Sequence, residues 1–124
     1  MSSRHVVGAA LFDVAAIVIF VAIGRRSHDE PGNVVVDAGV VAAPFLIGLA
    51  VAWLVVRAWR RPLGLRTGVA IWPITIVVGM IMRRFAFDRG TAASFIVVAT
   101  IATGVLLVGW RLAAQALSAR AVSA

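Results

Sequence analysis

The chain of 124 residues is 62% hydrophobic and only 14% charged, and its 12 arginines, with no lysine, against five acidic residues give a formal net charge of +7. Because soluble domains are about 45 to 50% apolar and about 25% charged, a domain this small cannot bury so much apolar surface in water. The composition, with a mean hydropathy of +1.03 and no cysteine, excludes a disordered tail, a disulfide-stapled module and a multidomain enzyme, and it predicts a membrane protein.

The excess of arginine does not indicate a nucleic-acid partner. A nucleic-acid-binding protein gathers its basic residues on one wettable face, whereas here the arginines stand in short clusters between long uncharged runs. Clusters with this spacing are typical of the flanks of membrane spans.

The first predicted span covers residues 6–24, an apolar run that only Asp13 interrupts. At about 1.5 Å per residue, its length nearly matches a hydrocarbon core of roughly 30 Å. A secretory signal is the alternative, because Arg4 precedes the run and Ala22 and Gly24 have the spacing of a cleavage site. The run is longer than the usual core of such a signal and carries an acid, so a span is favoured.

Three further spans are predicted at residues 36–58, 66–83 and 92–111, followed by a short tail at 112–124. The third is the shortest, so the arginines at its ends are expected to extend toward the membrane interfaces. No stretch alternates apolar and polar residues as a β-barrel strand would. The connections of about ten residues force neighbouring helices to be antiparallel. The predicted fold is therefore all-α, an antiparallel four-transmembrane-helix bundle that forms one membrane domain over residues 1–124.

The distribution of arginines predicts the orientation of the bundle. With four spans both termini lie on one side, and that side has seven arginines against five on the other. Because arginine accumulates on the cytoplasmic side, cytoplasmic termini are expected. The four tryptophans, of which Trp53 is the deepest in its span, suit anchoring at the interfaces.

Two parts of the chain carry motifs of a known family. The first has Asp13 and the run Ile23-Gly24-Arg25-Arg26-Ser27-His28. The second extends from Arg83-Arg84 through Gly90-Thr91-Ala92-Ala93-Ser94-Phe95 to Gly109-Trp110-Arg111. In these motifs the chain resembles the small prokaryotic membrane proteins known only as domain of unknown function 3054. The resemblance covers about His5 to Arg111. It implies four spans in a cytoplasmic (inner) membrane, and it implies no activity.

Asp13 is the most informative polar residue, because it lies about 10 Å into the hydrocarbon, where an ionised carboxylate costs on the order of 3 kcal/mol. Its neighbours on the helix are small, so it is expected to point into the bundle. Arg57 and Arg111 end spans on the same side and have side chains long enough to reach it. Two interpretations stay open: a structural pair that fixes the packing of the helices, or a titrating or ion-coordinating group.

A second polar group is predicted at the opposite side, where Asp37 opens the second span and Arg83 and Arg84 close the third. Two helix faces are expected to meet nearby, since residues of each fall on one stripe. These residues are Asp37, Val41, Pro44, Gly48 and Ala52 in the second span, and Gly68, Trp72, Thr75, Gly79 and Arg83 in the third. Pro44 and Pro73 each free one backbone carbonyl, which allows either a packing kink or a break at a ligand site.

The sequence offers no constellation for catalysis, metal binding or a cofactor. His5 and His28 flank the first span, roughly 30 Å apart by helical rise, so they cannot share a haem or a metal. His28 stays a candidate interfacial polar site. The acids are too few and scattered for a triad, and a glycine-rich phosphate loop is missing. The sequence therefore predicts that the protein is not an enzyme.

Two functions remain consistent with these observations. The favoured one is a non-enzymatic binding, oligomeric or accessory subunit, whose partners are membrane lipids and a second copy or another membrane protein. The alternative is a small transporter or channel that uses Asp13 and arginines, as an oligomer. Recognition of lipid headgroups by the basic cluster Arg57, Arg60, Arg61 and Arg66 is a third, weaker interpretation.

Overall fold

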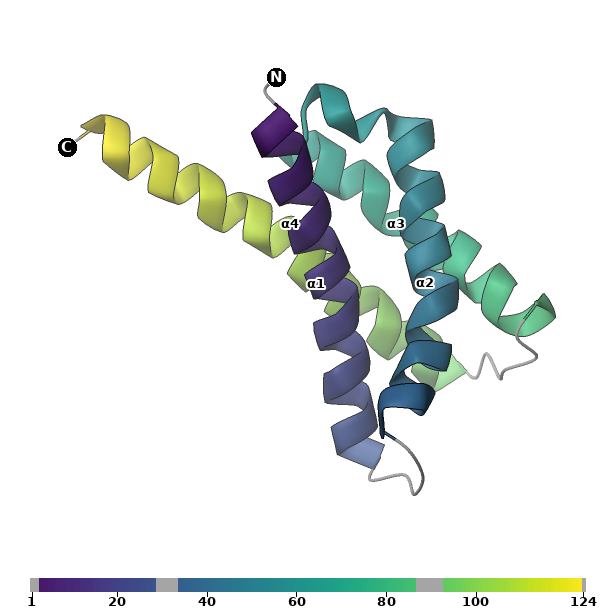
Figure 1. Cartoon of the computed structure of the whole chain (residues 1–124). Coiled ribbons are helices and arrows are strands. Elements are labelled where there is room, and N and C mark those ends of the chain that lie inside the picture. The colour runs from purple at the N-terminus through teal and green to yellow at the C-terminus, as the bar shows by residue number, and fades with distance from the viewer. Residues whose placement is uncertain (1–2, 29–33, 87–92, 124) are drawn as a thin grey trace.

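A computed structural model describes residues 3–28, 34–86 and 93–123 of the chain, with the side chains at 3, 24–28, 34–38, 94–95 and 119–123 outside the description. Over these ranges the chain is helical and contains no strand. The elements are α1 (Ser3–His28), α2 (Val34–Val56), the short 3-10 helix η1 (Ala58–Arg60), α3 (Leu65–Phe85) and α4 (Ala93–Ser123). Successive long helices run in alternating directions (Figure 1), which confirms the predicted all-α bundle.

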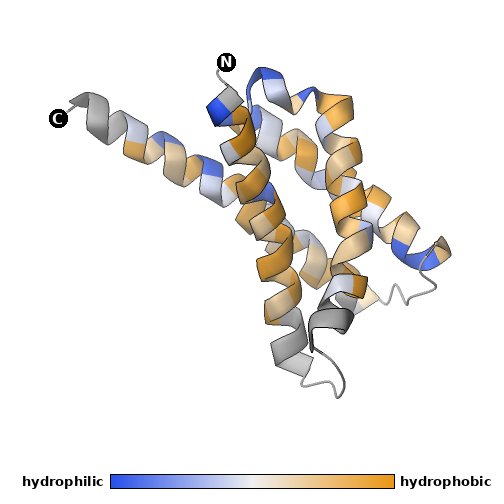
Figure 2. Cartoon of the chain, in the orientation of Figure 1, coloured by the Kyte–Doolittle hydropathy of each residue, from blue (hydrophilic) through white to orange (hydrophobic). Residues whose placement is uncertain are grey.

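The four long helices of the described residues are each long and apolar enough to cross a membrane. Apolar residues run along most of their length (Figure 2). Apart from the carbonyls that Pro44 and Pro73 leave free inside α2 and α3, a helical backbone satisfies its own hydrogen bonds, which is the requirement that lipid imposes on a spanning segment. The chain therefore has the form of a multi-pass membrane protein.

The helices differ from the predicted spans mainly at their ends. α2 ends at Val56, two residues before the predicted boundary, because Arg57 adopts a left-handed backbone with φ of 58°. α4 continues through the predicted tail to Ser123, and its last part extends away from the other helices (Figure 1). α1 continues to His28, four residues beyond the predicted end of its span.

The bundle packs most extensively between α2 and α3, with further contacts of α3 with α4 and of α1 with both α2 and α4. Its apolar core includes Phe45, Ile17, Ile71 and Leu107, which are all fully buried. About a third of the residues in each span are buried within the chain. Some of the remaining apolar side chains pack partly against the core, and many others are exposed on the outside of the bundle.

The predicted meeting of α2 and α3 occurs through glycines. A Cβ atom added at Gly48 would lie 2.6 Å from the backbone oxygen of Thr75 and 3.0 Å from the nitrogen of Gly79. One added at Gly79 would lie 2.5 Å from the ring of Phe45. Only glycine allows these two backbones to approach so closely, as in other membrane helix pairs.

Candidate functional site

The polar site of the bundle is built around Asp13, which α1 places facing inward and fully buried. Small residues one turn away, Ala9 and Ala16, are buried on the same face. They let the neighbouring helices approach the carboxylate, as the sequence predicted.

Arg111 of α4 is the arginine that reaches Asp13, and its side chain is also fully buried. Its Nη1 atom donates to Oδ1 of Asp13 and its Nη2 atom to Oδ2, both at 2.8 Å. This fork-to-fork arrangement is the strongest geometry available to an arginine and a carboxylate. Arg57, the other arginine that the sequence offered, is instead exposed.

Two tryptophans donate the remaining hydrogen bonds to the carboxylate of Asp13. The indole Nε1 of Trp53 in α2 donates to Oδ2 of Asp13, and that of Trp110 in α4 donates to Oδ1, both at 2.8 Å. A carboxylate has about four lone-pair positions, and here all four accept a hydrogen bond. Asp13, Trp53, Trp110 and Arg111 together form what we call the Asp13 cluster.

The guanidinium of Arg111 is held by backbone groups as well. Its Nε atom donates to the carbonyl oxygen of Pro62 at 2.9 Å, and Nη1 also donates to that of Leu107 at 3.0 Å. Gly68 of α3 packs against the same side chain, since a Cβ there would lie 2.8 Å from Cδ of Arg111. The cluster therefore involves all four long helices and the connection between α2 and α3.

Aromatic rings cover the outer side of the cluster. The rings of Phe12 and Trp110 stack with their centroids 5.0 Å apart. The guanidinium carbon of Arg111 lies 4.4 Å from the centroid of Trp110, close enough for a cation–π attraction. These rings lower the local polarity, which strengthens the hydrogen bonds within the cluster.

Sequence reasoning placed the tryptophans at the membrane interfaces and did not assign them bonds inside the bundle. Besides the two in the cluster, Trp72 donates through Nε1 to the carbonyl oxygen of Thr100 at 2.7 Å, whereas Trp59 is 42% exposed. The depth of Trp53 in its span was the signal that could have identified it as a donor. For Trp110, Pro62 and Gly68 the sequence carried no comparable signal.

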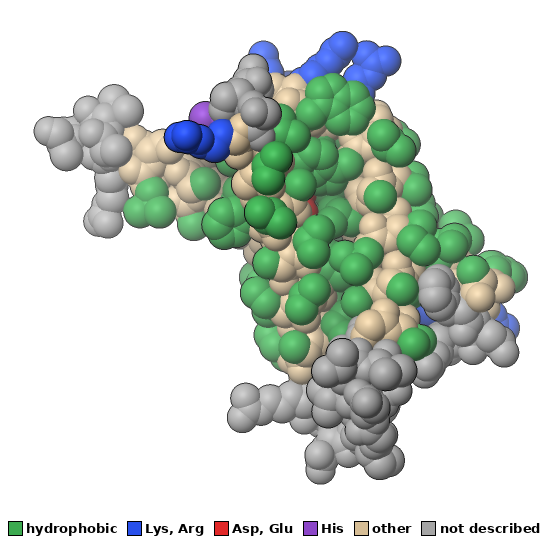
Figure 3. All heavy atoms as spheres, viewed as in Figure 1, with side chains coloured by type: hydrophobic (Ala, Val, Ile, Leu, Met, Phe, Trp, Pro, Cys, Tyr) green, Lys and Arg blue, Asp and Glu red, His purple; other side chains and the backbone are tan. Residues whose placement is uncertain are grey.

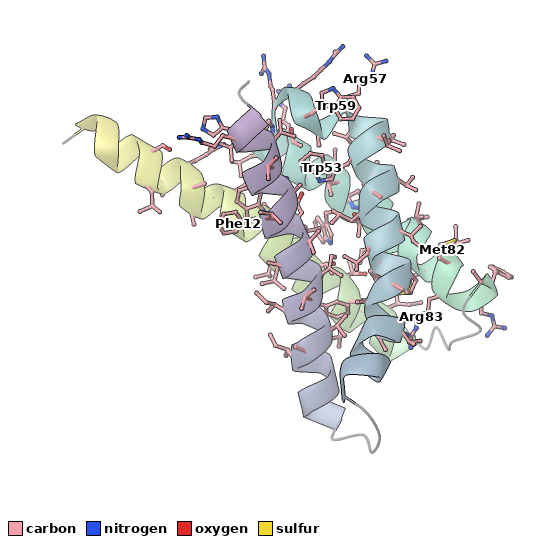
Figure 4. The ribbon with its side chains drawn as sticks, viewed as in Figure 1. Phe12, Trp53, Arg57, Trp59, Met82 and Arg83 are labelled. Carbon is pink, nitrogen blue, oxygen red and sulfur yellow. The ribbon has the colours of Figure 1, made fainter. Side chains whose placement is uncertain are left out.

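The second predicted polar group is only partly described. Arg83 is half-buried and Arg84 is exposed near the end of α3, and Figure 4 shows Arg83 far along α3 from the end of the bundle that carries Arg57. The side chains of Asp37 and His28 lie outside the described residues, so the expected cluster of Asp37 with these arginines stays a prediction.

Two further observations on the described residues concern metal ions and ligands. These residues contain no group of three or more His, Cys, Asp or Glu side chains that could hold a metal ion. A shallow hollow of about 340 Å³ opens between α3 and α4, and its surface is almost entirely apolar. It is lined by Val69, Trp72, Pro73, Ile76, Val77 and Thr100.

Comparisons with known proteins give one match. The sequence profile of a family described as "Protein of unknown function (DUF3054)" matches residues 10–114, a range that contains the whole Asp13 cluster. No curated protein gives a significant match to the chain. No solved structure does so either.

Proposed function

The chain belongs to this family of proteins of unknown function, and we propose that it is a non-enzymatic membrane subunit. It acts by binding a second copy of itself or another membrane protein. The observation that carries the proposal is the saturation of Asp13: its carboxylate accepts four hydrogen bonds and is neutralised by a buried arginine. A carboxylate so occupied stabilises the fold and has no lone pair free for a passing ion or solute.

Exposed apolar surface supports an assembly role. Large apolar side chains stand outward on all the long helices, including Leu11, Leu54, Ile81 and Val105. On the part of α4 beyond Arg111, Leu112 and Leu117 are exposed by more than half. In lipid, helix faces associate by close packing rather than by the hydrophobic effect. These outward faces are the surface available to a complementary helix of another subunit.

The proposed location is the cytoplasmic (inner) membrane of a prokaryote, with both termini on the cytoplasmic side. The distribution of arginines supports this orientation, since seven of the 12 belong to the side of the termini. Reporter fusions at both ends test it: activity of a cytoplasmic reporter at each end supports the proposal, and reporters in different compartments contradict it.

Single-cysteine cross-linking tests the assembly, because the chain has no cysteine of its own. Leu54→Cys and Leu117→Cys place a thiol on exposed faces, and Ala99→Cys places one at a fully buried position as the control. We expect oxidation in native membranes to give a covalent dimer, or a covalent adduct with a partner, from an exposed position and not from the control.

Native mass spectrometry in mild detergent provides the second measurement of assembly. A strictly monomeric particle with no co-purifying partner, together with no cross-linked product from any exposed position, would contradict the proposal. The alternative function, a small transporter or channel, predicts instead that protein in liposomes conducts protons, cations or small anions. It also predicts that Asp13→Asn abolishes this flux while the protein stays folded.

A further inference from the structure

Beyond the proposed assembly, the segment between α2 and α3 presents a concentrated basic surface. Four arginines within residues 57–66 are exposed, and Trp59 stands among them. Figure 3 shows arginine side chains projecting from the end of the molecule that carries the N-terminus and η1, and Figure 4 places Arg57 and Trp59 there. We call this surface the arginine face, and it consists of Arg57, Trp59, Arg60, Arg61 and Arg66.

The backbone beneath the arginine face is held in place by side chains of α3 and α4. The hydroxyl of Thr67 donates to the carbonyl oxygen of Arg61 at 2.6 Å. The next two carbonyls accept from Arg111 at 2.9 Å and from Gln115 at 3.4 Å. Because the segment is ordered before any ligand arrives, binding to it loses less conformational entropy than binding to a free loop.

Among the described side chains the one carboxylate is that of Asp13, and it is bonded to Arg111. No described acidic side chain therefore neutralises the arginine face. The sequence shows the same asymmetry over the whole chain. By the predicted topology, seven arginines and one acid belong to the side of the termini. The other side has five arginines together with four acids, Asp29, Glu30, Asp37 and Asp88. The positive charge of the protein is therefore concentrated on the side of the arginine face.

We propose that the arginine face binds the phosphate groups of anionic lipids in the surrounding membrane. The guanidinium group matches phosphate oxygens through paired hydrogen bonds. The arginine face begins directly after the end of α2 and ends in the first turn of α3. Because both helices are apolar along their length and turn back here, these arginines are expected at the depth of the lipid headgroups. A partly exposed tryptophan is also typical of this layer.

The test measures lipid retained by the purified full-length protein with native mass spectrometry, after equilibration with mixed micelles of phosphatidylglycerol and phosphatidylcholine. Wild-type protein is expected to retain phosphatidylglycerol preferentially. Removing the charge of two arginines with Arg60→Gln/Arg61→Gln should weaken this binding, by about fivefold per arginine. The matched control pairs single variants: Arg84→Gln removes one exposed charge near the end of α3 and should leave the retention unchanged, whereas Arg60→Gln alone should lower it.

A charge-preserving variant separates loss of binding from loss of folding. Arg60→Lys/Arg61→Lys keeps the charge but loses the paired hydrogen bonds, and it is expected to retain less phosphatidylglycerol than the wild type and more than the double glutamine variant. Added salt should lower retention by wild-type protein, because exposed charges are screened. Equal retention of the two lipids by the wild type, or an equal loss in the test and control variants, would overturn the proposal.

Discussion

The Asp13 cluster joins α1, α2 and α4 through four hydrogen bonds to one buried carboxylate, whereas α2 and α3 meet through backbone contact at Gly48 and Gly79. At the first contact every oxygen of Asp13 has a partner. At the second, the buried hydroxyl of Thr75 has no hydrogen-bond partner among the described residues. Helices in lipid associate through polar bonds and through close packing. This bundle uses the two kinds of contact in different places.

The difference also explains why the polar contact can lie in the hydrocarbon. A buried ion pair stabilises a fold only when its remaining donors and acceptors are well satisfied. Here two indoles bond to the remaining lone pairs of Asp13, and the carbonyls of Pro62 and Leu107 accept two of the further N–H groups of Arg111. The glycine contact needs no such network, because it places little besides backbone and apolar atoms against each other. The polar contact should therefore be the more sensitive of the two to loss of a single side chain.

The largest effect is expected from Arg111→Ala, which leaves the charge of Asp13 buried with two neutral donors. The free energy of unfolding in mild detergent should fall by about 3 to 5 kcal/mol. Asp13→Ala should cost a similar amount, and the double variant should cost less than the sum of the two because it leaves no uncompensated charge. Additive losses would show that the two side chains do not act as a pair.

A smaller effect is expected at the glycine contact. Gly48→Ala places a methyl group 2.6 Å from a backbone oxygen, which cannot rotate away, so α2 and α3 must separate. The free energy of unfolding should fall by about 1 to 3 kcal/mol. Gly39→Ala in the same helix is the matched control, since a Cβ there meets nothing within 4 Å. Its effect should lie between none and a gain of about 1 kcal/mol; equal losses in the two variants would refute close packing as the cause.

The smallest effect, with the opposite sign, is expected from Thr75→Val. This variant replaces a buried hydroxyl, for which the described part of the chain offers no hydrogen-bond partner, with a methyl group of similar size. The free energy of unfolding should therefore rise by up to about 1 kcal/mol. Thr103→Val is the comparison, because the hydroxyl of Thr103 donates to the carbonyl oxygen of Ala99 and its loss should not stabilise. A fall in stability for Thr75→Val would show that its hydroxyl has a partner in the folded protein.

Prediction from sequence succeeded where the pattern of side chains along a helix marks the face that it turns to its neighbours. Asp13 was expected to face inward because its own helix presents Ala9 and Ala16 on the same face, and both are buried. Gly48 was expected to face the third span on the basis of a stripe in each helix, and it lies against Thr75 and Gly79. The end of α2 was missed by two residues, since nothing in the sequence indicated that Arg57 would adopt a left-handed backbone.

The sequence by itself determined the membrane class and the four helices, because hydropathy and length are sums over neighbouring residues and need no knowledge of the rest of the chain. Only the tertiary structure decided that Arg111 rather than Arg57 neutralises Asp13, and that Trp53 and Trp110 complete the site. These choices depend on which helices lie side by side and how each is rotated about its axis. Such relations between residues as far apart as 13 and 111 arise when the helices pack.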